Sequence, residues 1–229
     1  MSLVCGIDVG SPETLSYVAY LKDTAFYFDV YIPTREQPLP QLPMGWNERP
    51  SCILVDGPQS LPLAGRSRRK CDELANTPTR KLPGTRTELA DTRLYRGLIQ
   101  AGLDIFWGVY RQNTYHIPGL GEKGPIIAET YPRYILKQQF PDLDPIPSKR
   151  KEPEKYVKAI WHRLLAQGFR CESVLNPTVD QVDAALAALT ALIFLNNGEP
   201  EQMQFGEQPV VDEAEEVIRE GFLVAPYAH

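Results

Sequence analysis

The chain has 229 residues, of which 43% are hydrophobic and 23% charged, as is usual for a globular protein. Its formal net charge of −5 argues against a dedicated nucleic-acid-binding protein. The four cysteines are far apart and the three histidines are scattered, so the spacing of a zinc site is absent and a reducing, cytoplasmic location is expected. We expect no signal peptide, because the chain does not open with a basic region followed by an apolar stretch. We also expect no membrane span, because the longest apolar run, 184–195, is too short.

The first quarter of the chain predicts a β-meander followed by a strand that repeats the opening motif. Residues 3–10 are an apolar, β-prone run, and residues 16–21 and 25–32 predict two more strands joined by a short turn, which favours antiparallel pairing. The segment 33–50 contains five prolines and cannot form a long helix. Residues 51–58 again form an apolar strand ending in Asp-Gly, and the preceding linker allows it to lie parallel to the first strand.

A basic segment interrupts this pattern at residues 60–97. It carries nine basic residues against four acidic ones, with Pro, Gly and Thr scattered through it. This composition favours a long functional loop with short helices. The alternative is an ordinary solvated face of the protein.

The second half predicts one more buried strand and several helices. Residues 125–132 form an apolar run that carries Glu129. Residues 178–181 have the spacing of a capping box, and the helix that follows is apolar on every side until Asn196, so it should be buried. Apolar spacing predicts further helices at 94–110, 134–140 and 153–167.

The end of the chain is strongly acidic. Residues 199–220 carry eight acids and one arginine, and a final edge strand is expected at 221–226. We therefore expect a single α/β domain over residues 1–229, with a basic loop insertion at about 60–97 and an acidic C-terminal extension at about 197–229.

Five acidic residues lie at the ends of apolar strands or at the start of an apolar helix, where a carboxylate is costly unless another group pairs with it. Asp8, Asp56 and Glu129 each lie at or near the end of an apolar strand, so parallel neighbours would gather their carboxylates at one edge of the sheet. Asp180 and Asp183 are three residues apart and share one helix face. Clustered carboxylates favour hard divalent cations. The alternatives are a strand-end aspartate bonded to the next turn for Asp8, and a favourable helix-dipole contact for Asp180.

At this point the chain resembles a known fold. An antiparallel meander followed by parallel strands and helices with these acids resembles the ribonuclease H-like fold, which implies a five-stranded mixed sheet, three antiparallel strands then parallel ones, flanked by helices. The last acidic helix is similar to the final helix of Holliday-junction resolvases of the RuvC type. With an Arg/Cys-rich segment at 68–72, the chain resembles the DUF429 family of predicted nucleases over about residues 3–195. The motifs that carry the resemblance lie at 6–10, 54–58, 128–132 and 182–191.

The resemblance implies a nuclease that hydrolyses phosphodiester bonds of DNA or RNA with two bound Mg²⁺ or Mn²⁺ ions. Asp8 would bridge the ions, Asp56 and Glu129 would complete their shells, Asp183 would bind from the helix, and Asp180 would be a fifth acid. The acidic net charge favours short or single-stranded substrates over long duplexes. The basic segment would contact phosphate through Arg66, Arg68, Arg69, Lys70, Arg80 and Arg86.

Two other classes of function stay open. A non-catalytic binding or scaffold protein on the same fold would use the basic segment for a partner. Residues 6–11 also resemble the first phosphate loop of the actin and hexokinase superfamily, but that machinery needs a second domain and a second Gly-rich loop, which 229 residues do not supply. Metal binding separates the nuclease from the scaffold.

Overall fold

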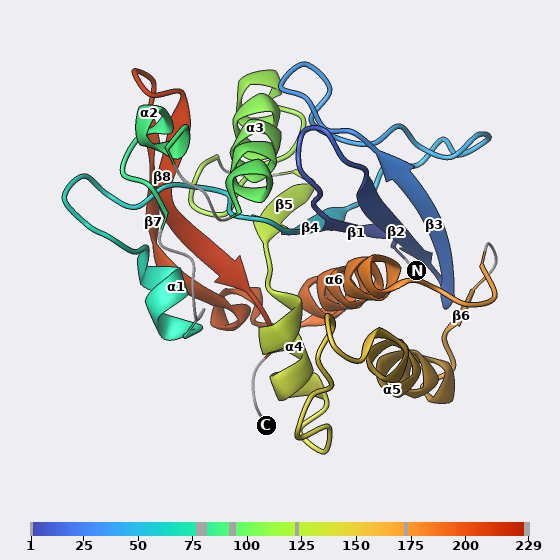
Figure 1. The fold of residues 1–229 in the computed structure, drawn as a ribbon. Helices are drawn as coiled ribbons and strands as arrows, with labels where there is room; N and C mark the ends of the chain where they lie inside the picture. Colours follow the sequence, from blue (N-terminus) through green and yellow to red (C-terminus); the bar gives the residue numbers. More distant parts are fainter. Residues whose placement is uncertain (1, 77–81, 92–94, 122–123, 172–173, 227–229) are drawn as a thin grey trace.

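The computed structural model describes residues 2–76, 82–91, 95–121, 124–171 and 174–226 (Figure 1). Within these residues the protein is α/β, with one mixed sheet of eight strands in the order β6-β3-β2-β1-β4-β5-β8-β7. The expected sheet of five strands is therefore too small. The strands are β1 (Val4–Asp8), β2 (Ser16–Lys22), β3 (Ala25–Tyr31), β4 (Cys52–Asp56), β5 (Ile126–Glu129), β6 (Arg170–Cys171), β7 (Gln204–Asp212) and β8 (Val217–Val224).

The five strands expected from the sequence form the middle of this sheet. β1, β2 and β3 are an antiparallel meander, β4 lies parallel to β1, and β5 lies parallel to β4. β1 is interior, because its residues are apolar toward both faces. The third strand is not at an edge, since the two-residue strand β6 pairs beyond it.

The acidic C-terminal extension is a hairpin that enlarges the sheet. β8 pairs parallel to β5 and antiparallel to β7, so β7 is the edge strand and the edge strand expected at 221–226 is instead internal. Acids are concentrated in the turn at 213–216, whereas β8 is buried along nearly its whole length. The total acid count hid this separation, because residues 199–220 include β7 and the first half of β8 as well as the turn between them.

Helices cover both faces of the sheet (Figure 1). One face carries the longest helix, α6, flanked by α4 and α5, and the other face carries α3 and the proline-rich segment. The predicted helices are confirmed within two residues at most boundaries. The helices are α1 (Lys70–Leu74), α2 (Arg86–Leu89), α3 (Arg96–Gln112), α4 (Pro132–Gln139), α5 (Pro153–Ala166), α6 (Val179–Asn196) and the short 3₁₀ helix η1 (Pro200–Met203).

The burial of α6 is confirmed and places its first turns over the end of β1. Thr178 and Gln181 form the predicted capping box. The helix crosses β1 so closely that a Cβ at Gly6 would collide with the backbone of Ala184 and Ala188. Among the described helices, α6 is the one long and apolar enough to cross a membrane, but most of it is buried against the sheet, as in the core of a soluble protein.

Candidate metal centre

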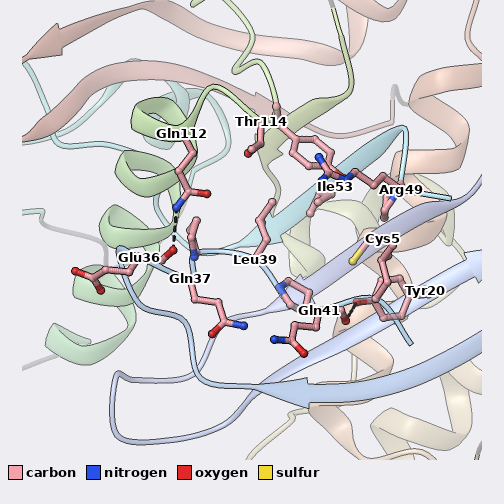
Figure 2. A pocket seen from close by; sticks show the side chains of 15 residues that line it. Cys5, Tyr20, Glu36, Gln37, Leu39, Gln41, Arg49, Ile53, Gln112 and Thr114 are labelled. Carbon is pink, nitrogen blue, oxygen red and sulfur yellow. Dashed lines mark hydrogen bonds between the residues drawn. The ribbon is translucent and has the colours of Figure 1, made fainter. Parts of the chain in front are cut away.

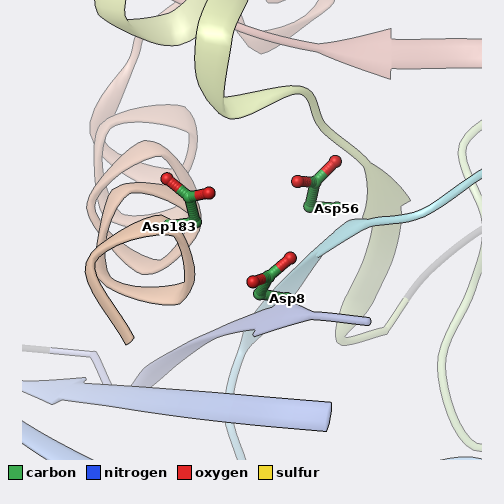
Figure 3. Close-up of side chains that lie close together, drawn as sticks. All are labelled: Asp8, Asp56 and Asp183. Carbon is green, nitrogen blue, oxygen red and sulfur yellow. The ribbon is translucent and has the colours of Figure 1, made fainter. Parts of the chain in front are cut away.

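Three aspartates meet at one edge of the sheet, under the beginning of α6. Asp8 and Asp56 are the last residues of the parallel strands β1 and β4, and they are paired in register. Residues at paired positions face the same side of a sheet, so both side chains point toward α6 and Asp183. One carboxylate oxygen of each of the three lies within 4.8 Å of the others (Figure 3).

The three carboxylates repel one another, because they carry charges of the same sign and are largely buried. Asp183 is 1% exposed and Asp56 is 7% exposed. Burial, followed by the negative charges of Asp56 and Asp183, raises the pKa of Asp8 well above its usual value. Burial also raises the pKa of Asp183 to about 6, although Lys149 acts in the opposite direction. Carboxylates held this close favour any cation that reaches them.

Lys149 and Tyr156 are two residues of the site that sequence reasoning missed. The Lys149 ammonium donates to Asp183 Oδ2, and the Tyr156 hydroxyl donates to Asp183 Oδ1. Desolvation acts to lower the pKa of Lys149, but Asp183, Asp56 and Asp8 together raise it. One local signal existed. Residues 149–151 read Lys-Arg-Lys just before α5 begins, where the helix dipole disfavours cations, which points to another partner.

Glu129 was expected in the cluster and lies on the opposite face of the sheet. It is paired in register with Val55 on β4, one position before Asp56. Because successive side chains alternate between faces, Glu129 shares the α3 side with Val55 and Ile127, whereas Asp56 points toward α6. The expectation that Glu129 converges with the three aspartates was therefore wrong, because its strand position differs by one residue from the position that faces α6. The converging acids are Asp8, Asp56 and Asp183.

Arg69, expected at a phosphate, is instead the counterion of Glu129. Its guanidinium makes five hydrogen bonds of 2.5 to 3.1 Å, to both oxygens of Glu129, both oxygens of Asp72 and the hydroxyl of Ser60. Arg69, Asp72 and Glu129 are all 0% exposed. Each guanidinium N–H is used, so Arg69 has neither the exposure nor a remaining donor for a substrate.

The rest of the basic segment is bonded largely to the rest of the protein. Arg66 pairs with Glu207 at 2.6 Å and Arg86 with Asp104 at 3.0 Å. Arg86 also donates to the carbonyl of Glu216, Arg68 to the carbonyl of Asp72, and Lys70 pairs with Glu73. Arg80 lies outside the described residues. The C-terminal hairpin thus supplies acids to the basic segment, which explains why opposite charges gather in these two stretches.

An open groove leads away from two of the three aspartates. It has a volume of about 880 Å³, and its lining includes Asp8, Asp56 and Asp180. Tyr95 and Arg96, where α3 begins, also line it. Asp180 is exposed in the first turn of α6 and is not one of the three converging acids.

A second pocket lies beneath the proline-rich segment, on the α3 face of the sheet (Figure 2). Its volume is about 370 Å³, and its walls include Cys5, Tyr20 and Arg49. Gln112 closes one side by donating to the backbone carbonyl of Glu36 at 2.9 Å. None of the three aspartates lines this pocket, so it is separate from the candidate metal centre.

The donor set at the three aspartates fits a hard divalent cation. Carboxylate oxygens are the ligands that Mg²⁺ and Mn²⁺ prefer, and the three are already close enough to share an ion through direct or water-bridged contacts. Comparison with known proteins found no matching family model, no matching curated protein and no matching solved structure.

Proposed function

We propose that this protein is a divalent-metal-dependent nuclease that hydrolyses phosphodiester bonds of DNA or RNA, with Mg²⁺ or Mn²⁺ as cofactor. The observation that carries the proposal is the convergence of Asp8, Asp56 and Asp183 from two adjacent parallel strands and a buried helix. The central strand order β3-β2-β1-β4-β5 supports it, since the ribonuclease H-like resemblance implies a meander followed by parallel strands.

The chain's own residues would prepare the site for such a reaction. When bound, a divalent ion at these carboxylates supplies a Lewis acid for the phosphoryl oxygen and lowers the pKa of a coordinated water. Asp8 and Asp56 present oxygens toward the open groove. Tyr156 and Lys149 fix the orientation of Asp183 by bonding each of its oxygens.

We propose that a short or single-stranded nucleic acid lies along the groove. Tyr95 is 54% exposed and offers an aromatic ring on which a base can stack. Arg96 is exposed in the first turn of α3, where an arginine and the backbone N–H groups both suit a phosphate. Arg96 also donates to the backbone carbonyl of Ala90 at 3.2 Å, but its side chain is exposed. The rest of the basic segment supports this substrate less than expected, because Arg66, Arg68 and Arg86 are bonded within the protein.

A cytoplasmic location fits the cysteines. None of Cys5, Cys52, Cys71 and Cys171 forms a disulfide, and the first three are buried. Cysteines outside disulfides are usual in a reducing compartment.

The test is cleavage of a panel of short DNA and RNA substrates in Mn²⁺, with wild type beside Asp8→Asn. We expect wild type to cleave at least one single-stranded substrate and Asp8→Asn to be inactive while still binding it, because the amide removes a ligand and a repulsive charge. Asp142→Asn is the matched control, since that exposed carboxylate pairs with Arg163 away from the cluster. Equal cleavage by Asp8→Asn and wild type would contradict the proposal.

A non-catalytic binding protein is the second candidate. It is favoured by the low positive charge of the groove, because Arg96 is the basic residue among the lining residues that the structure describes. The internal pairing of Arg66 and Arg86 means that such a protein would not use these two side chains for its partner, contrary to the expectation from the sequence. A binding protein has no requirement for the metal, so substrate binding that is unchanged by Mn²⁺, without cleavage, would favour it.

A further inference from the structure

The position of Lys149 bears on how many cations the acidic cluster holds. Both oxygens of Asp183 already accept a hydrogen bond, Oδ1 from Tyr156 and Oδ2 from Lys149. The Lys149 ammonium therefore stands where a cation ligated by Asp183 would stand. Its charge acts on all three aspartates, since each of them contributes to raising its pKa.

While Asp183 is paired with Lys149, a second metal ion would also lack ligands. Two-ion sites hold their ions about 3.5–4 Å apart and need carboxylates that bridge and flank both. Glu129, which was expected with Asp56 to complete the coordination shells of the two ions, faces the other side of the sheet and is neutralised by Arg69. Asp180 is exposed and lies outside the converging group. Asp8 and Asp56 remain as the carboxylates next to the open groove.

We infer that the Lys149 ammonium replaces one of two cations, so that the site binds a single divalent ion through Asp8 and Asp56 while Asp183 stays paired with Lys149. This inference rests on the proposed function in that the cluster binds a divalent cation, and it does not depend on cleavage. Lys149 is an accessible element of the site, because its side chain is 41% exposed and reaches Asp183 from solvent.

The inference is tested by counting Mn²⁺ ions bound to the full, metal-stripped chain, with the free ion followed by electron paramagnetic resonance. We expect one ion in wild type and two in Lys149→Met, because removing the ammonium frees Asp183 and its charge for a second cation. Lys149→Gln should also bind two, and it retains a donor for Asp183 if the methionine variant does not fold. Asp183→Asn should still bind one.

The control is Lys151→Met, which removes the same charge from a neighbouring exposed lysine and should still bind one ion. Two ions in wild type, none in wild type, or one in both Lys149 variants would each overturn the inference. Its failure is distinguishable from that of the nuclease proposal. One bound ion without cleavage refutes the nuclease and leaves the inference standing, whereas cleavage with two ions bound to wild type does the reverse.

Discussion

Two groups of acids lie on opposite faces of the same sheet, and they are built for opposite purposes. Glu129 and Asp72 share a fully buried arginine whose five N–H groups are all bonded. In the second group Asp183 pairs with one partly exposed lysine, and Asp8 and Asp56 line an open groove. The first group is saturated by its own counterion and closed to solvent. The second has two carboxylates at the groove, where a metal ion can reach them.

The comparison shows that burial and negative charge alone do not identify a site. Glu129 is 0% exposed, as buried as Asp183, and it ends a strand in the same sequence pattern as Asp56. What separates them is the counterion. A buried guanidinium bonds both Glu129 and Asp72 in one case, and a partly exposed ammonium bonds Asp183 in the other.

Removing the buried arginine should have the largest effect on stability. Arg69→Met leaves Glu129 and Asp72 buried without their guanidinium, and we expect a loss of about 3–5 kcal/mol in the free energy of unfolding, measured with urea. Arg66→Met is the control, because that exposed side chain pairs at the surface and its loss should leave stability near that of wild type. Equal unfolding midpoints for the two variants would mean that the buried network is not structural.

A divalent ion bound at the cluster of Asp8, Asp56 and Asp183 should stabilise the folded protein. The network of Arg69, Glu129 and Asp72 should not contribute to this effect. Adding Mn²⁺ at one hundred times its dissociation constant should raise the free energy of unfolding by about 2.7 kcal/mol. Thermal unfolding of wild type and Asp8→Asn with and without Mn²⁺ measures this, and we expect no rise in the variant. A rise of the same size in Asp8→Asn would place the ion elsewhere.

Without metal, the mutual repulsion of Asp8, Asp56 and Asp183 should destabilise the fold. Asp8→Asn removes one of three mutually repelling charges, so in EDTA its free energy of unfolding should exceed that of wild type by an amount on the order of 1 kcal/mol. Asp142→Asn, which loses a favourable surface ion pair, should show no such gain. A destabilised Asp8→Asn in EDTA would mean that wild-type Asp8 is stabilised by a cation of the protein itself.

Sequence reasoning found the open group better than the closed one, for physical reasons. Asp8 and Asp56 were predictable because an apolar strand ending in a carboxylate is costly without a partner. Asp183 was predictable because the helix that carries it is apolar on every side. Strand register is not visible in one sequence, and a shift of one position sent Glu129 to the other face.

The counterions were the part that sequence could not assign. Lys149 reaches Asp183 from 34 residues away along the chain, and Arg69 reaches Glu129 from 60 residues away. A cluster of basic residues at 66–70 looks the same whether its side chains face solvent or are buried. Similarly, a strand was expected at 221–226, but the acids before it gave no sign that β8 begins at Val217 and is buried inside the sheet.

The smallest expected effect concerns the groove and the basic segment as surfaces for nucleic acid. Arg96→Ala should weaken binding of a short single-stranded oligonucleotide and reduce the slope of log affinity against log salt concentration by about one unit, the effect of one lost phosphate contact. Arg66→Ala is the comparison, because its guanidinium is held by Glu207 and Glu220 and should contribute little to the slope. Fluorescence anisotropy over a salt series measures both slopes. If Arg66→Ala flattens the slope and Arg96→Ala does not, nucleic acid contacts the surface around Arg66 rather than the groove. The proposal that the substrate lies along the groove past Asp8 and Asp56 would then be wrong.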